Sequence, residues 1–164
     1  MNSAMEKMPG FPGLRWQWFQ LAEMRAGQLY DMLAFRESVF VVEQNCIYQE
    51  LDGLDKSAHH LVVTEAEKVV ACLRVLPPGG NDSRVRIGRV AVLAGWRKRG
   101  IARLMIHKAV ERAHKMASTG ICLNAQTYLQ GFYQSLGFEV CGDEYLEDGI
   151  PHVPMRLSGV GPGL

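Results

Sequence analysis

Four cationic side chains gather directly after an apolar, strand-like run, in the stretch VAVLAGWRKRGIARLM at residues 90–105. An amphipathic helical pattern begins at once after Gly100. The first amides of a helix have no partner within the helix, and its N-terminus carries partial positive charge. Because Gly100 has no Cβ, a ligand can approach the backbone closely. The stretch therefore predicts an anion site, and a phosphate or pyrophosphate is the ligand that suits it.

Two familiar phosphate loops do not fit this stretch. Gly95 and Gly100 have the spacing of a Walker A loop, but Ile101 and Ala102 stand where that loop requires Lys and Ser or Thr. The three glycines of a dinucleotide fingerprint are also absent. On the residues alone, a solvated basic helix start is the alternative to a binding site.

The composition indicates one domain with a sizeable core. The chain has 164 residues, of which 48% are hydrophobic, and 18 Lys and Arg stand against 17 Asp and Glu. Such a balance argues against a nucleic-acid coat or a polybasic membrane binder. No apolar run approaches the roughly 18 residues of a membrane span, and no signal peptide opens the chain.

Cysteine usage favours a reducing compartment. The four cysteines are widely spaced, form no CxxC pair, and lie mostly within apolar runs. We therefore expect buried thiols and a cytoplasmic protein, with neither a disulfide framework nor a metal site. The cysteines are Cys46, Cys72, Cys122 and Cys141.

Hydrophobic periodicity predicts an α/β fold, a mixed sheet layered with helices. Strands are expected at residues 15–21, 59–65, 68–76, 84–93, 121–126, 138–142 and 152–157, and helices at 24–42, 99–117 and 129–137. The turn EDGI, residues 147–150, separates the closing strands. We expect a flexible leader or cloning scar over residues 1–13, one domain over 14–158 and a flexible tail over 159–164.

Two motifs in order resemble the GCN5-related N-acetyltransferase (GNAT) superfamily. RKRGIA (97–102) is similar to its Q/R-x-x-G-x-G/A signature, and LQGFYQSLGF (129–138) resembles its closing motif. More narrowly, FRESVFVVEQNCIYQELDGLD (35–55) and EDGIPHVPMRL (147–157) resemble the bacterial ElaA-like branch. The resemblance covers residues 29–157. It implies a single-domain acyl-CoA N-acyltransferase fold with a mixed, mostly antiparallel sheet flanked by helices.

The resemblance further implies that the chain binds acetyl-CoA as acyl donor. The amides from Lys98 to Arg103 would hold the pyrophosphate, and residues 90–92 would bond the pantetheine like an added strand. The family's strand often carries a bulge here, which frees an amide for the thioester carbonyl. Gln126 stands where relatives usually have Asn, and Ala102 is an allowed variant of the signature. The implied cofactor-binding residues are Val90, Ala91, Val92, Arg97, Lys98, Arg99, Gly100, Ile101, Ala102, Arg103 and Gln126.

Amine acetylation needs an acid for the departing thiolate, and Tyr133 in the closing motif suits that role. An unperturbed phenol has a pKa of about 10 and is protonated at neutral pH. General acid catalysis contributes about 10²–10⁴-fold, and we expect the low end because a thiolate is not strongly basic. A core aromatic with its hydroxyl at the surface is the alternative interpretation.

Several residues are candidates for the base or the acceptor site. Our order of preference is Glu43, His152 and then Glu50, and the remaining candidates are Asp52, Asp55, His59 and His60. The acidic loop at residues 43–55 favours a cationic acceptor, or is simply a solvated loop with capping duties. Only one of two adjacent histidines can face inward on a strand.

The predicted activity is transfer of an acetyl group to a primary amine by direct attack in a ternary complex. A non-catalytic acyl-CoA sensor and an autoinducer-synthase-like acyltransferase are the alternatives. The acceptor would be an amine-bearing small molecule or peptide, with no nucleic-acid or membrane partner. The chain could pair its sheet edges in a homodimer. The sequence leaves the acceptor itself open.

Overall fold

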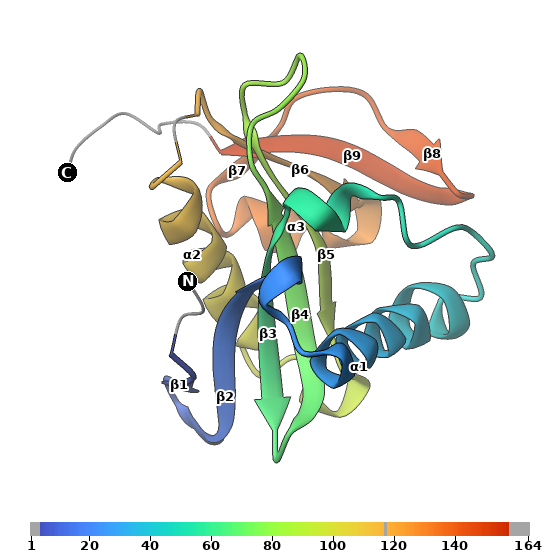
Figure 1. Cartoon of the computed structure of the whole chain (residues 1–164). Helices are drawn as coiled ribbons and strands as arrows, with labels where there is room; N and C mark the ends of the chain where they lie inside the picture. Colours follow the sequence, from blue (N-terminus) through green and yellow to red (C-terminus); the bar gives the residue numbers. More distant parts are fainter. Residues whose placement is uncertain (1–3, 117, 158–164) are drawn as a thin grey trace.

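The computed structural model describes residues 4–116 and 118–157, which form one sheet with helices on both faces (Figure 1). Within these residues nine strands follow the order β1-β2-β3-β4-β5-β6-β9-β7, with β8 paired to β9. The strands are β1 (Glu6–Met8), β2 (Phe11–Gln20), β3 (His59–Glu65), β4 (Lys68–Leu76), β5 (Val85–Val92), β6 (Ile121–Gln126), β7 (Phe138–Val140), β8 (Tyr145–Glu147) and β9 (Ile150–Leu157). The helices are α1 (Ala26–Glu37), α2 (Ile101–Ala113) and α3 (Gln130–Gln134), with short helical turns η1 (Leu21–Glu23), η2 (Ser38–Glu43), η3 (Leu54–Ser57), η4 (Ala94–Trp96) and η5 (Thr127–Leu129).

All strand pairs are antiparallel except β5 with β6, so the predicted α/β class with a mixed, mostly antiparallel sheet is confirmed. The hairpin of β3 and β4 has the predicted bounds, and so does β6. The predicted helix at residues 99–117 is shorter in the structure, where α2 ends at Ala113. Ala117 and the predicted tail at 159–164 lie outside the described residues.

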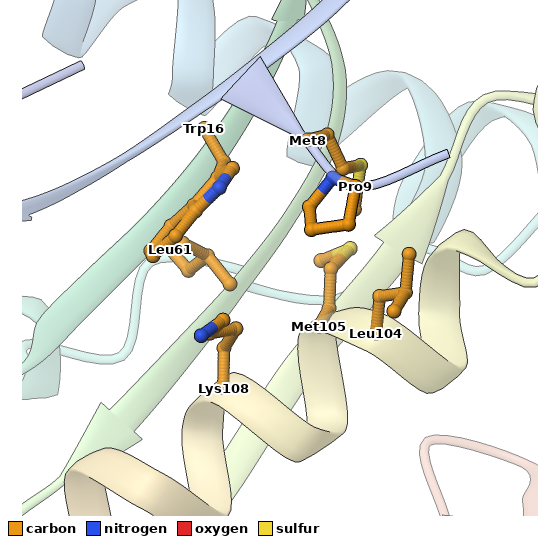
Figure 2. Close-up of a pocket in the computed structure, with 7 residues that line it drawn as sticks. All are labelled: Met8, Pro9, Trp16, Leu61, Leu104, Met105 and Lys108. Atoms are coloured by element: carbon orange, nitrogen blue, oxygen red, sulfur yellow. The ribbon is translucent and has the colours of Figure 1, made fainter. Parts of the chain in front are cut away.

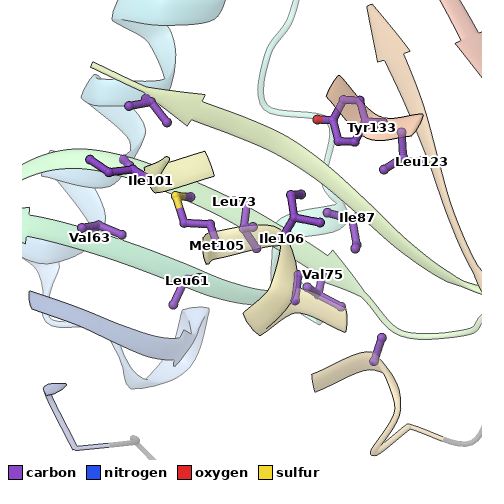
Figure 3. Close-up of a cluster of buried hydrophobic side chains, with 14 of the residues drawn as sticks. Leu61, Val63, Leu73, Val75, Ile87, Ile101, Met105, Ile106, Leu123 and Tyr133 are labelled. Carbon is purple, nitrogen blue, oxygen red and sulfur yellow. The ribbon is translucent and has the colours of Figure 1, made fainter. Parts of the chain in front are cut away.

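Alternation along the central strands divides the core into two layers. Leu61 and Leu73 belong to the large cluster on the α2 side, together with Met105 of α2 (Figure 3). Val62 and Cys72, the next residues along, instead pack against side chains of α1 and η2. Because successive side chains of a strand point to opposite faces, a strand covered on both sides is apolar throughout. This explains why β4 is apolar from Val69 to Leu76 except at Arg74.

The predicted helix at residues 24–42 is divided into two parts. Regular α-helix ends at Glu37, and η2 continues it as a π-helix to Glu43. A π-helical turn holds more residues per turn and occurs often at functional sites. Val39 of η2 remains buried against the sheet, and Glu43 is exposed at its end.

The expectation of a flexible leader over residues 1–13 is not met between residues 6 and 13. Glu6–Met8 forms β1, which pairs with β2, and β2 itself begins at Phe11. Met8 is buried, and Met8 and Pro9 lie beside Trp16 of β2 and Leu104 of α2 in a small apolar pocket (Figure 2). The segment lacks any periodicity, so only its packing on β2 and α2 defines it as a strand.

The C-terminal part of the sheet contains one strand that the sequence did not predict. Residues 145–147 form β8, a hairpin with β9, where the sequence suggested only a turn before the last strand. β9 pairs with three strands, β6, β7 and β8. β9 therefore connects the outer strands β7 and β8 to β6 and the rest of the sheet. No helix in the described part of the chain is long and apolar enough to cross a membrane.

Candidate functional site

Strands β5 and β6 separate from each other part of the way along their length. They pair in parallel only at Val85 with Ile121 and at Arg86 with Cys122, although β5 continues to Val92 and β6 to Gln126. Beyond Arg86, β5 keeps its partner β4 on one side and has no β6 partner on the other. Unpaired strand edges offer backbone donors and acceptors to an extended ligand. We call this opening the divergent strand pair.

A β-bulge lies on β5 beside the divergent strand pair. Cys72 pairs with Ala91 and Arg74 with Gly88, so β5 has one residue more than β4 between these pairs. Arg89 and Val90 are the two β5 residues between these pairs, and Arg89 has φ +53°. The bulge therefore occurs immediately before residues 91–92, as the family resemblance implied.

The cationic turn, residues 93–100, leads from β5 into α2. Gly100 is the N-cap residue of α2 and adopts φ +92°, a left-handed conformation that favours glycine. A Cβ built on Gly100 meets no atom within 4 Å, so the space in front of the helix start is open. Within the described residues, the amides from Lys98 to Arg103 donate to no protein acceptor. These unpartnered donors fit a pyrophosphate.

The basic side chains at the cationic turn and the start of α2 make different contacts. Arg97 donates from Nε to the Val92 carbonyl oxygen at 2.8 Å and forms a two-pronged ion pair with Glu43, with Nη2 to Oε2 at 2.9 Å. Arg99 stacks over the Trp96 ring at 4.9 Å, and Arg103 donates to Ser135 Oγ at 2.9 Å. Among the described residues, Lys98 makes no ion pair.

Glu43, the first-ranked base candidate, is bound by Arg97 on the surface. The hydrogen bond from Arg97 holds the pKa of the Glu43 carboxyl below its ordinary value. A carboxylate with a lowered pKa accepts a proton less readily, so this pairing makes Glu43 a poorer base. The ion pair also joins the end of η2 to the cationic turn.

Tyr133 is buried on the α2 side of the sheet, 6% exposed. Its ring meets Phe132 and Phe138 edge to face at centroid distances of 5.0 and 6.0 Å. In Figure 3 the hydroxyl oxygen points away from Leu123. Burial raises the pKa of the Tyr133 phenol above its ordinary value, so the group keeps its proton at neutral and mildly alkaline pH. A protonated phenol is the form that an acid catalyst requires.

Gln126 and His152 lie side by side at the end of β6, because they are paired in the ladder of β6 and β9. The Gln126 amide exchanges two hydrogen bonds with Gln44, at 3.3 and 3.2 Å, which links the end of η2 to β6. His152 Nδ1 lies 2.7 Å from the Ile150 carbonyl oxygen. Since a carbonyl only accepts, Nδ1 carries the proton and Nε2 is left to accept one. Nε2 lies 3.6 Å from Glu147 Oε2.

The carboxylates of the acidic loop pair with arginines, which reduces the negative charge on which the expected attraction of a cationic acceptor depends. Three arginines and three carboxylates form an arginine–carboxylate cluster on the α1 side of the sheet. Its members are Arg36, Glu50, Asp52, Asp55, Arg74 and Arg89. The opposite charges are equal in number, so the cluster has no formal net charge.

Burial and pairing act in opposite directions on the pKa values in this cluster. Burial raises the pKa of Asp52 and Asp55, but hydrogen bonds from arginine outweigh it and both pKa values end below their ordinary 3.8. His60 is the inward member of the histidine pair, 1% exposed, and burial lowers its pKa. Glu50 is 7% exposed and accepts from Arg36 at 2.8 Å. Glu50, Asp55 and His60 are therefore enclosed by the fold, whereas Asp52 is partly exposed.

Sequence reasoning missed the arginines of the cluster. Arg74 and Arg89 lie inside predicted strands, in the runs KVVACLRVL and RVRIGRVAVL. A charged residue within an otherwise apolar strand is a signal, because buried charge needs a partner. The acidic loop supplied the matching charges, and the two observations together could have suggested the pairing.

The fold is that of solved acyl-CoA N-acyltransferase structures. A family model described as the acetyltransferase (GNAT) domain matches residues 25–158. The chain therefore belongs to the GNAT family of acetyltransferases, and that family indicates an acyltransferase.

Its relatives lie in the ElaA-like branch. Protein ElaA of Escherichia coli is 38% identical over 145 residues, covering 87% of this chain and 95% of ElaA, and its crystal structure superimposes with a TM-score of 0.81. A UPF0039 protein of Schizosaccharomyces pombe is 44% identical over 80% of this chain and 88% of its own. The crystal structure of an acyl-CoA N-acyltransferase from Pseudomonas aeruginosa has a TM-score of 0.82 and 38% identity, covering 88% of this chain and 99% of its own.

Proposed function

We propose that this protein transfers the acetyl group of acetyl-CoA to a primary amine by direct attack in a ternary complex. The observation that carries the proposal is the juxtaposition of the divergent strand pair with the unpartnered amides of the cationic turn. An extended arm fits along the free edge of β5, and an anion fits at the start of α2. A pantetheine chain ending in a pyrophosphate has both features in this order.

The cofactor-binding roles follow the direction of β5. Residues 90–92 bond the pantetheine arm, and the amides from Lys98 to Arg103 hold the pyrophosphate. Lys98, Arg99 and Arg103 add positive charge around it. Arg97 acts indirectly in this proposal, since its guanidinium is bound to Val92 and Glu43 and so shapes the turn. Gln126 holds the other side of the opening through Gln44.

The proposed chemistry uses two groups on the β6 side. The amine nitrogen attacks the thioester carbon, and its proton passes to His152 Nε2, whose availability follows from the bond between Nδ1 and Ile150. Glu147 stabilises the resulting imidazolium across 3.6 Å. When the carbon–sulfur bond breaks, the thiolate takes the proton of the Tyr133 phenol. Among the predicted bases, this geometry favours His152 over Glu43, which is paired with Arg97.

The remaining features of the proposal are the acceptor, the compartment and the assembly. We propose an amine-bearing small molecule or peptide as acceptor, a cytoplasmic location and, as a further prediction, a homodimer. A non-catalytic acyl-CoA sensor has the same binding site, so only turnover separates it from the enzyme.

The first test is ligand-dependent unfolding followed by an amine screen. Acetyl-CoA at about 100 times its Kd should stabilise the protein by roughly 2.7 kcal/mol, a shift of about 5–10 °C, whereas NAD should not. Gly100→Glu should abolish the shift because its carboxylate occupies the phosphate position. Gly80→Glu is the matched control, since Gly80 also has positive φ and open space but lies in the turn before the other end of β5.

Thiol release from acetyl-CoA is then followed with a panel of primary amines. Release that requires both an amine and an intact Gly100 supports the acetyltransferase. Binding without release for any amine class favours the sensor. The absence of any thermal shift at millimolar acetyl-CoA contradicts the cofactor assignment itself.

A further inference from the structure

The bulge on β5 places a non-glycine residue in an unfavourable backbone conformation. Arg89 has φ +53°, a left-handed conformation that is unfavourable for a residue with a Cβ. Its carbonyl oxygen meets the Cys72 thiol at 3.8 Å, so it has turned out of the ladder. Such conformations persist where the surroundings hold them and often occur at functional sites.

The Arg89 side chain shows what holds this conformation. Its Nε donates to Glu50 Oε1 at 2.7 Å, and its Nη2 donates to the Glu50 carbonyl oxygen at 2.9 Å. Asp52 Oδ2 lies 3.4 Å from the same Nη2. The guanidinium also lies 6.0 and 5.9 Å from the ring centroids of Phe40 and Tyr48. Arg89 is therefore fixed on several sides by segments that follow α1.

Glu50 is itself held by a buried partner. Arg36 of α1 donates to both of its carboxylate oxygens, at 2.8 and 3.0 Å, and to both oxygens of Asp55, at 2.7 and 3.1 Å. Arg74 binds Asp55 at 3.0 Å and forms a two-pronged pair with Asp52. The cluster thus ties α1, β4 and the bulge of β5 to one loop. Arg74 is the β4 residue that pairs with Gly88, the β5 residue directly before the bulge.

We infer that Arg89 is a positioning residue, which holds the β5 bulge so that a backbone amide at residues 89–90 points at the thioester carbonyl oxygen. The inference rests on the proposed function. The three arginines and three carboxylates of the cluster pair with one another. We therefore assign the cluster a role in placing the backbone rather than in binding a ligand. The cationic turn does not depend on it, because Arg97 and the start of α2 hold that segment.

The test uses two variants at Arg89 and one control on the same strand. Arg89→Met keeps an apolar stem without the guanidinium, and Arg89→Lys keeps the charge without the fork that binds Glu50 twice. Arg86→Met is the control, because Arg86 lies on β5 before the bulge and pairs with Asp82 at 3.2 Å on the surface. CoA and acetyl-CoA affinities are measured for each.

The decisive measurement is the infrared carbonyl stretch of protein-bound acetyl-CoA carrying ¹³C at the thioester carbon. A hydrogen bond to the carbonyl lowers its frequency, so the wild-type and Arg86→Met bands should lie below that of free acetyl-CoA. In Arg89→Met the band should return toward the free value and kcat should fall by about 10²–10³-fold, as for the loss of an oxyanion donor. CoA affinity should be unchanged, and Arg89→Lys should be intermediate.

Two failures are distinguishable. A band in Arg89→Met that stays at the wild-type frequency, with CoA bound, overturns the positioning role and leaves the cluster as a scaffold. A wild-type protein that does not bind CoA, or binds acetyl-CoA with the band of the free thioester, overturns the proposed function instead. If Arg89→Met does not fold, Arg89→Lys decides alone, since a wild-type band in that variant shows that the two bonds to Glu50 do not position the amide.

Discussion

Two arginine-rich regions of this protein use the same residue type in opposite ways. In the cationic turn, Arg97 and Arg99 are exposed, and the backbone amides from Lys98 to Arg103, which have no protein acceptor among the described residues, are the donors that we propose for a ligand. In the arginine–carboxylate cluster, Arg36 and Arg74 are only 1% and 4% exposed, and carboxylates bind them from two sides. Burial, rather than residue type, therefore separates the arginines that are enclosed by carboxylates from those that lie at the surface.

The difference has an energetic consequence. An exposed ion pair contributes about 0–1 kcal/mol to stability, whereas removal of one partner from a buried pair costs about 3–5 kcal/mol. Substitutions in the cluster should therefore change folding, and substitutions of the exposed cations should change binding.

Arg36→Met should give the largest loss of stability, because it leaves the Glu50 and Asp55 carboxylates buried without their principal partner. The free energy of unfolding should fall by about 3–5 kcal/mol in chemical denaturation. Arg84→Met is the matched control, since Arg84 also binds one carboxylate with two bonds, at 2.9 and 3.1 Å, but on the surface. Equal losses of unfolding free energy in the two variants would contradict the proposed difference between buried and exposed arginines.

Tyr133→Phe removes the hydroxyl group of a buried ring, and among the described residues this hydroxyl is not one of the buried polar atoms without a partner. The ring contacts with Phe132 and Phe138 remain, so stability and acetyl-CoA affinity should be unchanged while kcat falls by about 100-fold. Tyr128→Phe, at an exposed site, should leave kcat unchanged. An active Tyr133→Phe enzyme would make the phenol a packing residue only. In the wild type, the raised pKa predicts no loss of kcat from ionisation of this phenol up to about pH 10.

The pH dependence of unfolding should report on the cluster rather than on the turn. Asp52 and Asp55 have folded-state pKa values below 3.8, so below that pH the unfolded state binds more protons than the folded state. Their contribution to stability is present above about pH 4 and is lost as the pH falls through the folded pKa values. Denaturation between pH 4 and 2 should show this loss, with a smaller slope in Arg36→Met, which removes a partner of Asp55. An unchanged slope would mean that Arg36 does not lower the pKa of Asp55.

Lys98→Gln should have the smallest effect, because an exposed cation contributes about 0.2–1 kcal/mol. Acetyl-CoA affinity should weaken by about 2–5-fold at low salt, and the difference should disappear near 1 M salt, where the Debye length is about 3 Å. Lys115→Gln, just beyond the other end of α2, is the control. A salt-independent loss would indicate that the Lys98 conformation at φ +61°, rather than its charge, matters.

The two regions also differ in how far the sequence predicts them. The cationic turn is contiguous, so its strand, glycine and helix start are visible in a few residues of sequence. The cluster joins residues 14, 22 and 39 positions apart, in the pairs Arg36–Glu50, Asp52–Arg74 and Glu50–Arg89. Such contacts depend on which faces of α1, β4 and β5 meet, and no local pattern encodes that.

The short strands make the same distinction. The apolar runs of β3 and β4 and the amphipathic periodicity of α2 are properties of neighbouring residues and were sufficient to predict these elements and the α/β class. The family followed from the resemblance of two short motifs. β1 and β8 are three residues long and exist because β2 and β9 offer them hydrogen-bonding edges. Sequence alone thus determined the core elements and the motif of the cationic turn. Tertiary packing decided the outer strands, the pairing of Glu43 with Arg97 and the neutralisation of the acidic loop, because each depends on partners distant in the chain.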